Sequence, residues 1–341
     1  MVKWLDRLQQ RSRFAGFVIA VVYKYLDDQG GYLAALLTYY AFVSLFPLLL
    51  LLTTTLGVLL WNRPEWRAQI VDSAISQFPL IGDQLSRPES LSGGTTAVVI
   101  GILGALYGGL GVGQALQNAM NTLWSVPRFD RRDPIKSRVH SLLLLVVLGS
   151  ALVATTLLTG LGRNWANLGV IGTAGVVTAS VLLNTAVCAV AFRVTTVRPL
   201  TWAQVMPGAV LAAAVWQGLQ WFGATYVSHV VASASVTNSV FAIVLGLLAF
   251  LYLVSTALML CAEINVVRVD RLHPRALLTP FTDNVDLTAA DRKAYAGQAE
   301  AQRAKSFQQV DVSFGDAQPD DEARTDSGDA RLKPAQSQES T

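Results

Sequence analysis

The side chains that could do chemistry in this sequence are polar groups inside or beside long apolar runs. Glu263 is the one acidic residue in the interior of such a run, and Asn265 follows it closely. A charged side chain in a lipid environment costs about 3 kcal/mol even on lenient insertion scales. We therefore expect Glu263 to pair with Arg138, Arg193 or Arg198, or else to line a hydrated cavity that contacts a ligand or a proton.

The sequence lacks the motifs of common catalytic centres. Its three histidines, His140, His229 and His273, are far apart and form no HxH or HExxH pattern. Neither a phosphate-binding loop with GK[ST] nor a Gly-x-Ser-x-Gly elbow is present. Cys188 and Cys261 both lie in apolar runs, which excludes a framework of disulfides. We expect no metal, no cofactor and no enzymatic activity.

The elements that must position these side chains are membrane helices. The chain of 341 residues is 52% hydrophobic and 14% charged, against about 25% charged in soluble proteins. Six apolar runs are long enough to cross about 30 Å of hydrocarbon, and none alternates with a period of two. We predict an all-α polytopic membrane protein, a bundle of six transmembrane helices within residues 33–266. The expected spans are 33–61, 96–116, 140–162, 169–192, 203–228 and 237–266.

Two further segments flank this domain. Residues 1–32 are predicted to hold an interfacial helix, because the apolar run Phe14–Tyr23 is too short to span. Residues 267–341 are predicted to be a mostly disordered tail. From residue 280 onward the tail carries 12 acidic and 7 basic side chains and almost no large apolar ones, so burial cannot repay its ordering entropy.

The distribution of basic residues predicts the orientation. Lys and Arg number 22 in one set of alternate loops and termini and 4 in the other. By the positive-inside rule, both termini are expected in the cytoplasm. The basic segment RFDRRDPIKSRVH fits this topology or a contact with anionic lipids, so we expect membrane lipids as partners and no nucleic acid.

This orientation brings most of the polar groups of the spans to the inner leaflet, where they form either a cavity or ligand site or a purely structural knot between helices. Pro47 predicts a kink in the first span. In the second span, Gly101, Ala105, Gly109 and Gly113 recur every four residues and predict a close-packing face. The candidate site residues are Tyr40, Ser44, Pro47, Asn118, Asn121, His140, Arg193, Glu263 and Asn265.

Three stretches resemble the YihY/BrkB family of bacterial inner-membrane proteins, including its YhjD-type members. They are AALLTYYAFVSLFPLLLLL, LQNAMNTLWSVPRFDRRDPIKSRVHSL, and WAQVMPGAVLAAAVWQGLQWFGATY with the later LGLLAFLYLVSTALMLCAEINVV. The resemblance covers about residues 12–268 and implies six membrane helices with both ends inside. Its recognisable positions are Tyr40, Ser44, Pro47, Asn121, Trp124, Pro207, Glu263 and Asn265.

The resemblance also implies a role in envelope integrity and, for the YhjD-type, export of a lipid A precursor. Family members have carried the label ribonuclease BN, but this chain offers no metal cluster or general acid and base in a water-exposed site. We expect a bacterial inner-membrane protein that handles an envelope lipid or another amphiphile. The alternative is a structural or scaffold membrane protein that transports nothing. The long acidic tail departs from the shorter family members.

Overall fold

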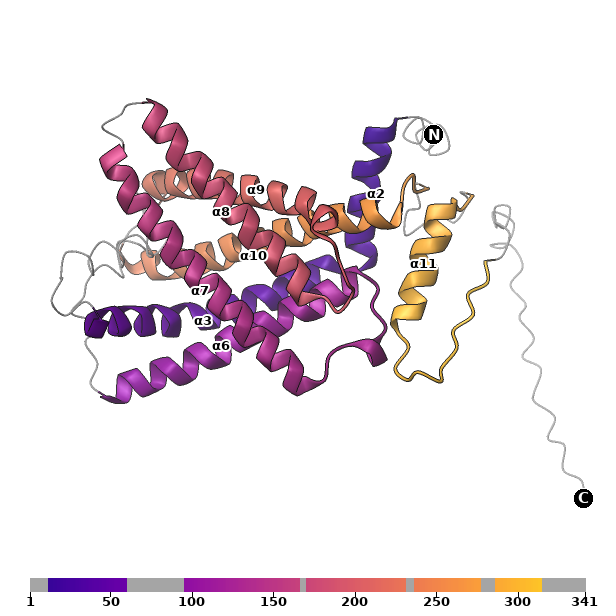
Figure 1. Ribbon diagram of the computed structural model, residues 1–341, viewed down its shortest axis with the longest axis horizontal. Helices are drawn as coiled ribbons and strands as arrows, with labels where there is room; N and C mark the ends of the chain where they lie inside the picture. The colour runs from indigo at the N-terminus through magenta and orange to yellow at the C-terminus, as the bar shows by residue number, and fades with distance from the viewer. Residues whose placement is uncertain (1–11, 60–94, 166–169, 231–235, 277–285, 315–341) are drawn as a thin grey trace, which may run out of the picture.

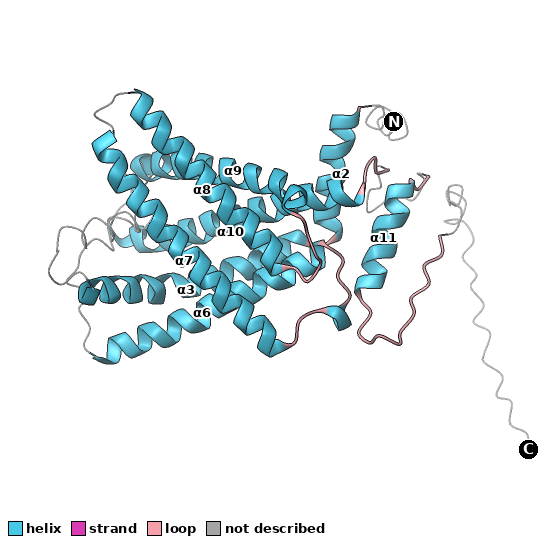
Figure 2. Cartoon of the chain, in the orientation of Figure 1, coloured by secondary structure: helices cyan, strands magenta, loops and turns pink. Residues whose placement is uncertain are grey.

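The computed structural model describes residues 12–59, 95–165, 170–230, 236–276 and 286–314. Within these ranges the chain forms helices and loops and no strand, as Figure 2 shows. Six helices are long: α3 (Gly30–Leu59), α6 (Thr95–Leu123), α7 (Pro134–Trp165), α8 (Val170–Thr195), α9 (Trp202–Val230) and α10 (Val236–Asp270). Two α-helices are shorter, α2 (Arg13–Asp27) and α11 (Ala289–Ala301), and a short 3-10 helix covers Arg128–Asp130. The prediction of an all-α protein is confirmed.

The six long helices have the dimensions of membrane spans. The shortest, α8, has 26 residues, which at 1.5 Å per residue is about 39 Å, more than the thickness of the hydrocarbon core. Within the described residues, three segments are also apolar enough throughout to cross a membrane: Pro134–Ala151, Ala174–Thr195 and Val244–Asp270. The chain is thus an all-helical membrane protein, and the count of six spans stays a prediction.

The long helices pack as a closed ring in which neighbours in sequence are mostly neighbours in space. Each helix from α6 to α10 contacts the next, and α3 closes the ring by contacting both α6 and α10. Successive helices alternate in direction, so that α2 and α11 both lie across the same end of the bundle (Figure 1). We call this the α2/α11 end.

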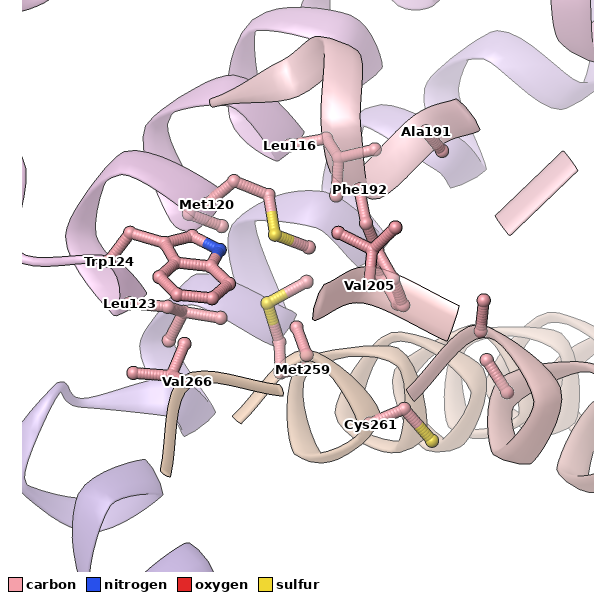
Figure 3. Packing of buried hydrophobic residues seen from close by; sticks show 14 of the residues in the cluster. Leu116, Met120, Leu123, Trp124, Ala191, Phe192, Val205, Met259, Cys261 and Val266 are labelled. Carbon is pink, nitrogen blue, oxygen red and sulfur yellow. The ribbon is translucent and has the colours of Figure 1, made fainter. Parts of the chain in front are cut away.

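Among the described residues, much of the apolar core lies near the α2/α11 end. Its largest buried side chains include Met120 and Leu123 of α6, Phe192 of α8, Val205 of α9 and Met259 of α10. Figure 3 shows these side chains directed towards one another from four helices. This part of the described core lies at the end where the candidate polar residues are predicted to gather.

Helix α2 is amphipathic, as predicted for an interfacial helix. Its apolar side chains Phe14, Val18, Val22 and Leu26 recur every four residues and are exposed. Its opposite face, with Gly16, Ala20 and Lys24, is buried. This arrangement suits a helix that offers one face to lipid and the other to the bundle.

The expectation of a disordered tail is wrong for residues 286–314. Helix α11 begins with a capping box, in which Thr288 Oγ1 accepts the N–H of Asp291 at 3.1 Å and the Asp291 carboxylate accepts the N–H of Thr288 at 3.0 Å. The helix buries Ala290, Asp291, Ala294 and Ala301. Small side chains and a buried ion pair order this segment, which is why its lack of large apolar residues misled the prediction. Residues 315–341 and the outer loop lie outside the described residues.

Candidate functional site

Glu263 lies two turns before the end of α10 and is completely buried. Both of its carboxylate oxygens lack a hydrogen bond within the described part of the chain. Its electrostatic neighbours are Lys24, Asp28 and Asp27, from the end of α2 and the residue that follows it. The cation that faces Glu263 is therefore Lys24 of α2.

Lys24 is also buried, with 1% of its surface exposed. Its ammonium group forms an ion pair with Asp28 and donates to the carbonyl of Leu123, 3.2 Å away at the end of α6. Burial lowers the pKa of Lys24, but the carboxylates of Glu263, Asp28 and Asp27 together raise it above its ordinary value. Lys24 thus joins α2, α6 and α10 at one point.

A second buried cation extends this group of charges towards α11. Arg275 follows α10 and is fully buried; its Nη2 lies 2.9 Å from Asp27 Oδ2, and its Nε donates to Asp291 of α11. Burial raises the pKa of Asp27 more than Arg275 lowers it. We call the six side chains the charged network: Glu263, Lys24, Asp28, Asp27, Arg275 and Asp291. It runs from the interior of the bundle to α11.

The arginines considered as partners of Glu263 are engaged elsewhere or exposed. Arg198 makes a two-pronged ion pair with Asp270, with nitrogen to oxygen distances of 2.8 and 2.7 Å. Arg193 stacks over the ring of Trp202 at 4.4 Å, and Arg138 is exposed. The pairing of Glu263 with any of these arginines is therefore not observed among the described contacts.

Asn265 maintains the helix around Pro207. A proline inside a helix cannot donate a backbone N–H and disturbs the preceding turn. Asn265 Oδ1 accepts the N–H of Gly208 at 2.8 Å, its Nδ2 donates to the carbonyl of Val205 at 3.1 Å, and Arg268 donates to the carbonyl of Ala203. The side chains of α10 thus satisfy the backbone of α9 where the proline interrupts it.

Asn121 and Asn118 organise the loops at the α2/α11 end. Asn121 Oδ1 accepts the N–H of Val197 at 3.0 Å and the hydroxyl of Thr196 at 3.3 Å, just after α8. Asn118 Oδ1 accepts a hydrogen bond from Arg131 at 2.9 Å. Both asparagines and Tyr40 line a cavity of about 330 Å³.

Tyr40, Ser44 and Pro47 face the glycines of α6. A Cβ added at Gly108 would lie 2.6 Å from the Cα of Ser44, and one at Gly111 would lie 2.1 Å from the ring of Tyr40. Gly104 meets Pro47 in the same way. The contact between α3 and α6 therefore depends on glycines, and these three side chains serve packing.

The close-packing face predicted in α6 contacts a different helix. Added Cβ atoms at Gly109 and Gly113 would lie 3.0 Å from Leu145 and 2.6 Å from Ser141, both of α7. His140, also on α7, has its Nδ1 2.9 Å from the carbonyl of Lys136, and its described contacts do not include the charged network. The predicted candidates are thus divided among several places, and only Glu263 belongs to the charged network.

Sequence reasoning missed Lys24, Asp27, Asp28, Arg275 and Asp291 as site residues. One signal could have identified Lys24: it continues a stripe of small residues at Gly16 and Ala20, spaced by four, which predicts a buried face. Asp291 carried a second signal, since Thr288 and Asp291 have the spacing of a capping box. Nothing local in the sequence predicts that Arg275 is buried.

Two larger polar cavities flank α11. One of about 570 Å³ is lined by Lys24, Trp124, Arg198 and side chains of α11. The other, of about 720 Å³, is lined by Asp27, Asp28 and the opposite side of α11, with Arg128 and Arg131. In the described part of the chain, no three His, Cys, Asp or Glu side chains are placed to hold a metal ion.

Comparison with known proteins finds a match to a protein family. Residues 21–283 match the family described as Virulence factor BrkB. The match includes every long helix, Glu263, Lys24 and Arg275, and it ends before α11. No curated protein and no solved structure matches the chain.

Proposed function

Because the chain belongs to the Virulence factor BrkB family and carries a buried charged network at one end of a helical membrane bundle, we propose that it moves an envelope lipid or a similar amphiphile between leaflets. It would act in the bacterial inner membrane with both termini in the cytoplasm. Membrane lipids are its expected partners, and we assign it no enzymatic activity, cofactor or nucleic-acid ligand.

The observation that carries this proposal is the environment of Glu263. Burying a carboxylate without a hydrogen-bond donor costs free energy, and the Glu263 side chain is fully buried without such a donor in the described part of the chain. Ionisable side chains that are buried in membrane proteins at such a cost usually belong to functional sites. Packing does not account for it, because Asn265, Asn121 and the glycines of α6 already join the helices.

The polar cavities at the α2/α11 end supply the second support. They have volumes of about 570 and 720 Å³, within the range of ligand sites. Helix α2, which contributes Lys24 to one cavity, exposes the apolar side chains of Phe14, Val18, Val22 and Leu26. An amphiphile could place its head group in such a cavity while its chains remain in lipid.

A translocation assay in proteoliposomes tests the proposal. A phospholipid with a fluorescent head group should move between leaflets faster in the presence of the protein. Glu263→Gln should abolish the gain, whereas Asp130→Asn, an exposed acid in the loop after α6, should retain it. No movement above protein-free vesicles with a panel of envelope lipids would contradict transport. Equal activity of Glu263→Gln and the wild type would contradict the role of Glu263.

The second candidate is a structural membrane protein that transports nothing. The contacts of Asn121, Asn265, Ser44 and Tyr40 favour it, since each serves helix geometry or packing. In that case neither the wild type nor Glu263→Gln would move lipid faster than protein-free vesicles, and Glu263→Gln would leave an envelope-stress phenotype unchanged.

A further inference from the structure

Asp291 occupies a site built for an oxyanion. Its Oδ1 accepts from the guanidinium Nε of Arg275 and its Oδ2 accepts from the N–H of Ala276 at 2.9 Å. The carboxylate is completely buried, as is Arg275. A guanidinium combined with a backbone N–H is the donor set that proteins use for carboxylate and phosphate groups.

The two halves of this contact come from different parts of the chain. Arg275 and Ala276 lie within residues 21–283, the region that matches the family, whereas Asp291 belongs to α11, beyond it. The receiving half therefore lies within the family region, and the occupant lies beyond it.

Helix α11 presents one face to this site. Asp291, Tyr295 and Gln298 lie on the same side of the helix by their spacing. The guanidinium of Arg275 lies over the ring of Tyr295 at 5.2 Å, and Gln298 Nε2 donates to the carbonyl of Asp27 at 2.6 Å and to Asp28 Oδ1 at 3.2 Å. The helix thus covers Asp27 and Asp28 of the charged network.

The space beside α11 is large enough for a head group. The two polar cavities lie on either side of the helix, and both are lined by its residues and by Ser125. If α11 left, it would no longer separate the two cavities and would uncover Arg275, which pairs with Asp291. The rest of the lining includes both cations and carboxylates: Lys24, Arg128, Arg131, Arg198, Asp27, Asp28 and Asp270.

We propose that Arg275 and the Ala276 N–H bind the oxyanionic head group of the amphiphile, a phosphate in the first instance, and that α11 is a built-in competitor whose Asp291 fills this site at rest. The inference rests on the proposed function and deepens it, since it assigns the chemistry of the head group. A tethered carboxylate competes at high effective concentration, so binding of the head group requires α11 to leave.

Hydrogen exchange in the wild-type protein tests the competition. The full chain is placed in nanodiscs of phosphatidylcholine, alone, with added phosphatidic acid, or with inorganic phosphate in solution. Phosphatidic acid should raise the rate of amide exchange in residues 289–301 by about tenfold. This corresponds to a tenfold shift in the equilibrium between docked and undocked α11. An effect of inorganic phosphate of equal size would assign the site to free phosphate. Unchanged exchange with both anions would overturn the proposal.

A pair of variants provides the second measurement. Asp291→Asn removes the competing charge and should bind phosphatidic acid about tenfold more tightly than the wild type. Asp286→Asn makes the same change at an exposed residue just before α11 that lines neither cavity, and this variant should bind as the wild type does. Equal affinities for the wild type and both variants would also overturn the proposal, and the exchange measurement decides the question if Asp291→Asn does not fold.

These results are separable from those of the translocation assay. Competition by phosphatidic acid without translocation would leave the anion site in place and remove the transport function. Translocation without any response of α11 would leave the transport function and remove the anion site.

Discussion

At the scale of single residues, Lys24 is a central charge of the bundle end. It is buried among Asp28, Asp27 and Glu263, and its ion pair is made with Asp28 rather than with Glu263. Removing Lys24, one partner of a buried ion pair, leaves the charge of Asp28 uncompensated. Neutralising Glu263, whose carboxylate has no hydrogen-bond donor among the described residues, leaves that ion pair in place.

Substitutions at Lys24 and Glu263 should therefore act in opposite ways. Lys24→Met leaves three carboxyl groups near one another without their shared cation and should lower the free energy of unfolding by about 3–5 kcal/mol. Glu263→Gln keeps the Lys24–Asp28 pair and should hold or raise the melting temperature while function is lost.

Thermal unfolding of the purified variants, together with complementation of an envelope-stress phenotype, provides the measurement. A large loss of stability in Glu263→Gln would show that this carboxylate is needed to compensate a cation. A stable and fully functional Glu263→Gln would show that the carboxylate has no role.

At the scale of elements, the contact between α9 and α10 depends on the absence of a side chain at Gly208. A Cβ at this position would lie 2.2 Å from the carbonyl oxygen of Cys261 and 2.4 Å from Asn265 Nδ2. The backbone of α10 cannot yield as a flexible side chain would. The same substitution would also displace the hydrogen bonds that Asn265 makes around Pro207.

We predict that Gly208→Ala destabilises the protein by about 1–3 kcal/mol, the usual cost of overpacking. Gly218 lies on the same helix with nothing within 4 Å of an added Cβ. Gly218→Ala should therefore be neutral or stabilising by up to about 1 kcal/mol, because alanine favours the helix. Equal melting temperatures for the two variants would contradict the close approach of α9 and α10.

Helix α11 is the second element whose contribution can be measured. Truncation after residue 285 removes the carboxylate that pairs with Arg275 and the hydrogen bonds of Gln298, so it should lower the melting temperature. Truncation after residue 314 keeps every described contact of α11 and serves as the control. Equal melting temperatures for the two truncated chains would show that α11 is not docked on the bundle.

At the scale of the whole molecule, the prediction concerns orientation. Helices of alternating direction place the ends of α6, α8 and α10 on the same side as α2 and α11 (Figure 1). The Lys and Arg distribution of 22 against 4 predicts that this side faces the cytoplasm. The charged network would then face the cytoplasmic leaflet.

Reporter fusions test this orientation. Fusions after residue 130 and after residue 341 should give a cytoplasmic signal, and one near residue 80 should give an external signal. An external signal from the C-terminal fusion would overturn the topology and would place the charged network at the outer leaflet.

The sequence by itself determined the helical class, the segments that form long helices and the family. These follow from composition and from the length of apolar runs, which are local quantities that a lipid environment makes decisive. It also identified Glu263 as exceptional, because a charge in an apolar run is visible without any knowledge of the fold.

Only the tertiary structure decided which groups surround Glu263. Arg193 and Arg198 lie at or just after the end of α8 and were candidate partners of Glu263. Arg193 instead stacks on Trp202, and Arg198 pairs with Asp270. Lys24 reaches Glu263 because α2 crosses the bundle end and buries its stripe of small residues. Arg275 is buried because Asp291, 16 residues later, folds back onto it. The periodicity of a helix shows which residues share a face, but the partner of that face is chosen by packing between segments far apart in the chain.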